Sequence, residues 1–219
     1  MMRVLLTTVL GLGFALSVHA GTLQQDVRNT PHEGAALETP SAANLIAWAK
    51  AHPDHWLAAD PIAAKVRGLT LSEAAEVVNR EVNALITYQS ENSPYGKSVD
   101  NWLSAKEATG KDGRMRGDCE EFAMLKIVIL WKAGFNPKNF GFAFFGWSDG
   151  STTHAAAFVD VDGSLEGRLI LSNDVDRALP YFGFTSEFGN AYVFSLYSAA
   201  DGSEAVCDVI KAKLDCVRL

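Results

Sequence analysis

Cys119 stands at a position in the sequence that favours nucleophilic chemistry. It follows Asp118, a good N-cap for an apolar helix that is predicted over residues 118–133 and closed by Gly134. The unpaired N–H groups and the dipole at a helix start favour an anion, so they are expected to lower the pKa of the thiol. The same N–H groups can stabilise the oxyanion of an acyl-transfer intermediate. A buried structural cysteine is the alternative, because free cysteine is among the most buried residue types.

A histidine suited to activate this thiol follows along the chain. Beyond residue 20, only His154 lies downstream of Cys119, and it begins the strand-like run HAAAFVDV. A base at the mouth of a strand after a cysteine-bearing helix is typical of a Cys–His pair, although a structural histidine at a strand end is the alternative. His32, His52 and His55 lie in N-terminal segments without a partner pattern and are interpreted as surface residues.

Three polar residues after the next strand are candidates to orient the imidazole. Ser172, Asn173 and Asp174 end the run RLILSND. An aspartate or asparagine there accepts the second imidazole N–H and sets the tautomer and orientation of the ring. On a regular strand Ser172 and Asp174 share a face, which favours Asp174. Asn173 is the alternative, and it requires a twist or bulge that turns its side chain toward His154.

The elements that must position these residues change in type along the chain. Helices are predicted over 41–51 and 69–88, and the segment 89–117, rich in Ser, Asn, Gly and Lys, is predicted to be a long connection. Short aromatic or β-branched runs after the cysteine helix predict an antiparallel meander, over 140–147, 153–161, 168–173 and 191–197. Helices followed by strands indicate an α+β fold, in which the cysteine helix, apolar on most sides, packs against the sheet.

The first twenty residues have the features of a secretory signal. A short basic start (Met1–Arg3) precedes an apolar run (Val4–Val18) and a small-x-Ala pattern that ends at Ala20. The run is shorter than the roughly 20 residues of a transmembrane helix. We therefore expect cleavage near Ala20, a flexible lead-in over 21–40, a single domain over 41–219, and a periplasmic or secreted protein.

Composition excludes several classes of protein. The 219 residues are 48% hydrophobic and 21% charged, which is the balance of a globular domain with a core. The net charge of −7 argues against a nucleic-acid partner, since such partners need a basic face.

The three cysteines are expected to differ in state. Their odd number leaves at least one thiol unpaired within a monomer. Cys207 and Cys216 are nine residues apart, which on one helix is roughly 13 Å and too far for a disulfide, so pairing them requires a bend. We predict that they are bonded and that Cys119 is the free thiol.

The residues around Cys119 resemble those of the bacterial transglutaminase-like cysteine peptidases, a family that includes periplasmic adhesin-releasing proteases of the LapG type. The similarity covers roughly residues 70–175, about half of the chain that would remain after cleavage. It is carried by GDCEEFA (117–123), TH (153–154), LILSN (169–173), VNREVN (78–83), Tyr88, YG (95–96), DNW (100–102) and Glu107. The resemblance implies a papain/transglutaminase-like core, a Cys–His–Asp triad, secretion and, in many members, calcium.

One departure from the family concerns the third residue of the triad. Where the family has Asp-Asn after the strand, this chain has Ser172-Asn173, and Asp174 follows one place later. Either Asp174 is the orienting residue through a shifted strand, or Asn173 acts as in papain-like enzymes. With an unshifted register Ser172 occupies the position of the acid, where a hydroxyl is a weaker substitute.

Three acids bracket the cysteine: Asp118, Glu120 and Glu121. Acids in a first helical turn ordinarily complement the helix dipole. The resemblance implies calcium ligands at these positions, and clustered carboxylates suit a hard cation. A cation there would also offset the repulsion between the acids and a thiolate.

These observations predict an exported cysteine endopeptidase that uses Cys119, His154 and Asp174 or Asn173. By resemblance its substrate is a protein, with a surface adhesin as the candidate, and an inner-membrane receptor is a candidate regulator. Two alternatives remain. One is an amidase or transglutaminase, because a thioester can be resolved by water or by an amine; the other is a non-catalytic binding relative.

Overall fold

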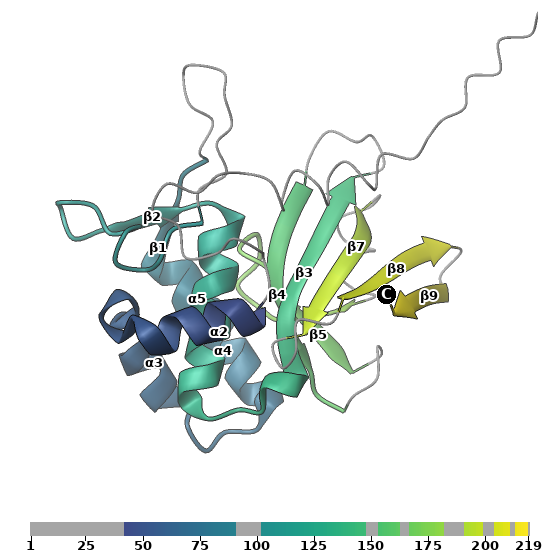
Figure 1. Cartoon of the computed structure of the whole chain (residues 1–219), viewed down its shortest axis with the longest axis horizontal. Helices are drawn as coiled ribbons and strands as arrows, with labels where there is room; N and C mark the ends of the chain where they lie inside the picture. The colour runs from purple at the N-terminus through teal and green to yellow at the C-terminus, as the bar shows by residue number, and fades with distance from the viewer. Residues whose placement is uncertain are drawn as a thin grey trace, which may run out of the picture.

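The computed structural model describes residues 42–90, 102–147, 153–162, 167–181, 191–198, 204–210 and 213–218. Within these ranges the helices gather on one side of an antiparallel sheet (Figure 1), so the predicted α+β fold is confirmed. The predicted signal and lead-in lie outside the described residues. No helix in the described part is long and apolar enough to cross a membrane.

The helices come first along the described chain. They are α2 (Ala42–Ala51), α3 (Ala59–Val66), α4 (Leu71–Leu85) and α5 (Cys119–Ala133), with 3-10 turns at Pro53–Trp56 and Pro137–Asn139. Thr70 and Glu73 form a capping box at the start of α4, which satisfies two backbone donors there. The sequence did not predict α3, whose proline lies in the first turn, where no intrahelical bond is lost.

The predicted helix over 69–88 ends earlier than expected. Residues 86–88 form β1 (Ile86–Tyr88), which pairs in parallel with β2 (Met115–Gly117) and sets Tyr88 opposite Gly117. Ile86 and Thr87 are β-branched, so they favour a strand once a partner strand is present. This pairing brings the end of α4 beside the residues that immediately precede Cys119.

The main sheet has the strand order β6-β5-β4-β3-β7-β8-β9. Its strands are β3 (Phe140–Trp147), β4 (Thr153–Asp160), β5 (Arg168–Leu171), β6 (Leu179–Pro180), β7 (Ala191–Ser198), β8 (Glu204–Ile210) and β9 (Lys213–Arg218). The predicted meander is right for β3, β4 and β5, but β7 pairs with β3 and extends the sheet on its other side. The hairpin of β8 and β9 was not predicted, and β5 ends at Leu171 rather than at residue 173.

Helix α5 is the centre of the core. It lies between the other helices and β4 (Figure 1), and most of its residues are buried. It ends at Gly134, whose φ of 95° is a left-handed conformation that glycine adopts without strain. Because α5 is enclosed on nearly all sides, its first residue, Cys119, is held in place relative to β4.

Candidate active site

Cys119 begins α5 and lies beside the start of β4. Its Sγ accepts a hydrogen bond from the backbone N–H of Ala155, the residue after His154, and its S–H points to Glu120 Oε2 at 3.0 Å. Burial raises the pKa of the Cys119 thiol, and the Glu120 and Asp118 carboxylates raise it further, while the Ala155 amide lowers it. The expected lowering of the thiol pKa is therefore wrong for this arrangement, because lost solvation and two nearby negative charges outweigh the helix dipole.

His154 lies at the start of β4 and is almost fully enclosed, with 8% of its surface exposed. Its Nε2 is 3.0 Å from Ser172 Oγ and 3.4 Å from Asp174 Oδ2. Burial lowers the pKa of His154, the Asp174 carboxylate raises it, and Lys126 lowers it again. The net direction is downward, so the imidazole is favoured over the imidazolium at neutral pH.

Ser172 connects His154 to Asp174. Its hydroxyl donates to Asp174 Oδ2 at 3.1 Å, and its Oγ accepts the backbone N–H of Asp174, also at 3.1 Å. Since the hydroxyl proton is committed to the carboxylate, the contact with His154 places the imidazole proton on Nε2. Nδ1 is then the unprotonated nitrogen of the neutral ring and can act as a base.

Asn173 is placed differently from its two neighbours. Its Oδ1 is buried, and among the described residues it has no hydrogen-bond partner. Ser172 and Asp174 both approach the imidazole, as two residues on one face of an extended segment should.

Two of the three acids converge on the cysteine. One ligand atom each from Asp118, Cys119 and Glu120 lie within 4.8 Å of one another. Carboxylate oxygens are ligands that calcium prefers, so Asp118 and Glu120 fit a hard cation at this point. This is the one such cluster of three or more metal-ligating side chains in the described part of the chain.

Glu121 turns into the protein and holds backbone groups. Its Oε1 accepts the N–H of Leu103 and its Oε2 accepts the N–H of Asp118, both at 2.9 Å. Burial and the adjacent Asp118 raise the pKa of Glu121 to about 9. A Cβ at residue 117 would meet the Glu121 side chain at 2.6 Å, so Gly117 is what allows this close approach.

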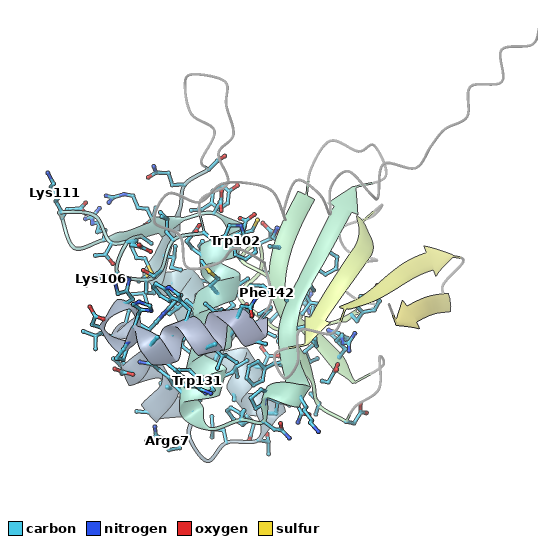
Figure 2. All side chains as sticks on the ribbon, viewed as in Figure 1. Arg67, Trp102, Lys106, Lys111, Trp131 and Phe142 are labelled. Carbon is cyan, nitrogen blue, oxygen red and sulfur yellow. The ribbon has the colours of Figure 1, made fainter. Side chains whose placement is uncertain are left out.

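The segment that begins at Trp102 packs over the start of α5. Trp102 is buried and meets Phe142 of β3 edge-on, with ring centroids 5.4 Å apart (Figure 2). The next residue, Leu103, is the one that donates to Glu121. The loop, the sheet and the cysteine helix are thus tied together at one place.

Tyr88 is a residue of this site to which the sequence reasoning gave no role. It is 60% exposed, yet its partial burial raises the pKa of its hydroxyl, and negative charge on Cys119, Asp118, Glu120 and Asp174 raises the pKa further. Its position therefore borders both halves of the candidate site. The signal was present in the sequence, since Tyr88 belongs to the block that resembles the family.

A cavity of about 210 Å³ lies next to the strand that leads into Cys119. Its lining residues are Gln89, Leu103, Glu107, Ala108, Gly110, Arg116 and Gly117.

Three further polar side chains, Asn79, Asn83 and Lys126, contact the segment that contains Ser172 and were also missed. The signal for them in the sequence is that each is a polar residue among apolar residues of a predicted helix.

A buried helix that begins with cysteine and packs on an antiparallel sheet, with a histidine at the start of the adjoining strand, defines a papain/transglutaminase-like cysteine enzyme. The family model of the bacterial transglutaminase-like cysteine proteinases (BTLCP) matches residues 58–186, more than half of the sequence, and the chain belongs to this family. It is therefore a cysteine proteinase, and a protein is its class of substrate.

Solved structures of LapG from Legionella pneumophila share this fold. The calcium-bound form has a TM-score of 0.51 and 21% identity, and covers 73% of this chain and 84% of its own. The EGTA-treated form has a TM-score of 0.54 and 19% identity, and the match covers 80% of this chain and 90% of the LapG chain. A third LapG structure has a TM-score of 0.53 and 21% identity, and the match covers 73% of this chain and 83% of the LapG chain. No curated protein matches the chain.

Proposed function

We propose that this proteinase cleaves its substrate with Cys119 as nucleophile, His154 as general base and acid, and Asp174 as the residue that orients the imidazole. The observation that supports this assignment most directly is the hydrogen-bonded series from His154 Nε2 through Ser172 Oγ to Asp174 Oδ2. It leaves Nδ1 as the basic nitrogen. The bond from the Ala155 N–H to Cys119 Sγ also supports the proposal, because Ala155 follows His154 in the chain.

The reaction proceeds through a thioester. Nδ1 of His154 takes the Sγ proton of Cys119 while Sγ bonds to the scissile carbonyl carbon, and the carbonyl oxygen becomes an oxyanion. The backbone N–H of Cys119, at the first position of α5, has no partner within the helix and is a donor for this oxyanion. The C–N bond then breaks and the amine leaves with the proton from His154.

Hydrolysis regenerates the enzyme. Water gives a proton to Nδ1 of His154 and adds to the thioester carbonyl, and collapse of the second tetrahedral intermediate expels Sγ, which regains the proton. Through both halves Asp174, aided by the Ser172 hydroxyl, keeps the ring in one tautomer and stabilises the imidazolium.

Calcium is proposed as the bound cation, with Asp118 and Glu120 as ligands. This proposal is supported by the convergence of their ligand atoms beside Cys119 and by the calcium-bound LapG structure. Glu121, the third acid of the predicted ligand set, lies outside this cluster and accepts the N–H groups of Leu103 and Asp118. A bound divalent cation would supply positive charge that offsets the repulsion between the carboxylates and a thiolate.

We further propose a periplasmic or secreted location, a surface adhesin as substrate, and control by an inner-membrane receptor. The location is supported by the signal-like residues 1–20. The substrate and the regulator are supported by the resemblance to LapG-type proteases. Asn173 is retained as the alternative orienting residue.

The test uses the protein without residues 1–20 and a purified adhesin fragment from the same bacterium. Cleavage should require Cys119 and His154, so Cys119→Ala and His154→Ala should abolish it while both variants keep the circular-dichroism spectrum of the wild type. His55→Ala is the matched control, because His55 contacts Ser104 rather than Ser172. Cleavage by Cys119→Ala at the wild-type rate would refute the assignment.

A second measurement needs no substrate. Iodoacetamide should alkylate Cys119 faster in the wild type than in His154→Ala, because the imidazole accepts the thiol proton. Added calcium should increase the rate in the wild type and not in Glu120→Gln. Equal rates in all three proteins would oppose both the Cys–His pair and the calcium site.

A further inference from the structure

The segment that presents Ser172 and Asp174 is not held by the sheet. The last ladder pair of β5 is Leu171 with Ala157, and residues 172–175 continue beyond the end of the strand. A polar segment outside a ladder needs other partners for its carbonyl groups if it is to keep one conformation. Here those partners are side chains from two helices.

Asn83 of α4 is the first of these side chains. Its Nδ2 donates to the carbonyl oxygen of Ser172 at 3.0 Å and to that of Val175 at 2.9 Å. The two acceptors lie on either side of Asp174 in sequence, so one carboxamide spans the turn that contains the carboxylate. Asn79, one helical turn earlier, adds a second donor to Val175 O at 2.7 Å.

Lys126 of α5 holds the other side of Ser172. Its Nζ donates to the carbonyl oxygen of Leu171 at 3.0 Å, and the side chain is fully buried. Lys126 is seven residues after Cys119, about two turns of the same helix. The helix that begins with the cysteine therefore also fixes the backbone next to the hydroxyl that meets His154.

These contacts are made at a cost to folding. The Oδ1 atoms of Asn79 and Asn83 are buried and, among the described residues, have no hydrogen-bond partner. Lys126 occupies a position at which an apolar side chain would avoid the desolvation of an ammonium group. Side chains that leave buried polar groups incompletely satisfied yet converge on one short segment are typical of sites where position has a functional consequence.

We propose that Asn83 and Lys126 are positioning residues of the proteinase: by holding the carbonyl groups of Ser172 and Leu171, they set Ser172 and Asp174 against the His154 imidazole. The proposal rests on the proposed role of His154. Neither residue touches the reacting atoms, so both act through the orientation of the ring.

The decisive variant is Asn83→Leu, which nearly preserves the volume and removes both donors. We expect kcat to fall by roughly 10- to 100-fold, the usual range for an outer residue that orients an active group, with little change in KM. Glu76→Leu is the matched control. Glu76 lies on the same helix and accepts the N–H of Ala178, beyond the segment that meets His154, so its loss should leave kcat unchanged.

A double-mutant cycle separates positioning from general stability. If Asn83 acts through Ser172, then Asn83→Leu should cost little further activity once Ser172→Ala is present. Multiplicative losses in the double variant would overturn the proposal, as would full activity of Asn83→Leu. Should Asn83→Leu fail to fold, Asn83→Ala and Lys126→Met enter the same cycle and are judged by the same criterion.

The ¹⁵N chemical shifts of the His154 ring provide a readout that does not depend on cleavage. In the wild type they should report protonated Nε2, and in Asn83→Leu a mixture of tautomers. Unchanged shifts in a folded variant would contradict the positioning role. Failure of the proposed function is distinguishable, because it would be seen in the wild type as absence of Cys119-dependent cleavage.

Discussion

The imidazole of His154 meets the hydroxyl of Ser172, at 3.0 Å, and the carboxylate of Asp174 lies one hydrogen bond beyond that hydroxyl. Ser172 is fully buried, whereas the Asp174 side chain is 42% exposed. The enclosed hydroxyl is therefore the nearer partner of the ring, and the negative charge lies toward the solvent.

Loss of either member of this series should slow catalysis, and Asp174→Ala should have the larger effect, because it removes the negative charge that stabilises the imidazolium. An imidazole without its acceptor loses its tautomer and orientation, which in related triads lowers the rate by up to ~10⁴-fold. The exchange variant with Ser172→Asp and Asp174→Ser should retain activity, because it places a carboxylate directly on Nε2. The measurement is kcat/KM with the adhesin fragment.

Asn173→Ala serves as the control for these variants and should be close to wild type. An inactive Asn173→Ala together with a fully active Asp174→Ala would assign the orienting role to Asn173 instead.

Calcium affinity should depend on the acids that converge beside Cys119. Glu120→Gln removes one charged ligand, so calorimetric titration should show calcium binding at least ~10-fold weaker, since ligand charge tunes calcium affinity. Asp112→Asn is the comparison, because Asp112 is paired with Arg116 outside the cluster. Equal weakening by both substitutions would indicate a general charge effect rather than a site.

Glu121 should have a structural role that is measurable without calcium. Glu121→Ala leaves the N–H groups of Leu103 and Asp118 without their acceptor, and each such loss in a partly buried place costs ~1 kcal/mol or more. Chemical denaturation in EGTA should therefore show a free energy of unfolding lowered by about 1–3 kcal/mol. The same measurement on Glu120→Ala should show a smaller change; an equal or larger one would contradict this division of roles.

Lys126 should make stability rise with pH on the alkaline side. Burial lowers the pKa of Lys126 well below its ordinary 10.5, although the charges of Asp174 and Asp176 partly oppose this. A positive charge on Lys126 also lowers the pKa of His154. Between the lowered pKa and 10.5 the unfolded chain binds the extra proton, so unfolding is favoured as the pH falls through that range.

Lys126→Met should remove this contribution, which amounts to at most ~1.4 kcal/mol per pH unit, and should be more stable than the wild type at neutral pH. Denaturant midpoints across the alkaline range measure the effect. Lys65→Met, at an exposed lysine, should keep the wild-type slope. The prediction fails if Lys126→Met is less stable than the wild type and its free energy of unfolding changes with pH in the same way. That result would show that Lys126 keeps its proton in the folded protein.

Cys207 and Cys216 should form a disulfide in the exported protein. They are directly opposite each other in the β8–β9 hairpin, which provides the bend that pairing requires. Opposed residues of antiparallel strands have Cα atoms about 4.5–5.5 Å apart, within the range that a disulfide spans. Thiol titration of the unfolded, unreduced protein should find one group in the wild type and none in Cys119→Ala; three groups in the wild type would refute the bond.

Local signals in the sequence were sufficient for the parts of the site that lie at the ends of single elements. Asp118 before an apolar run predicts where α5 begins, and with it the place of Cys119 at a helix start. The run from His154 predicts β4 by its composition. Both predictions depend on capping and on local preference, which act over a few residues.

The tertiary structure decided everything that depends on groups distant in sequence. Asn83 and Ser172 are 89 residues apart, so no local pattern shows that one holds the other. The lowered pKa expected for the Cys119 thiol was wrong because burial and the nearby Glu120 carboxylate raise it. Both causes depend on how α5 packs against β4, which the sequence does not show. Likewise, only the fold shows that Glu121 turns toward Leu103 while Glu120 turns toward the thiol.

The sequence by itself therefore determined that helices precede the main sheet, that a helix starts at Cys119 and that a strand starts at His154. The partner of the imidazole was decided by the end of β5, where the chain leaves its ladder and is held by α4 and α5. The physical reason is that a hydrogen bond between side chains depends on distances of a few tenths of an ångström. Such distances are set by the packing of whole elements and not by the preferences of single residues.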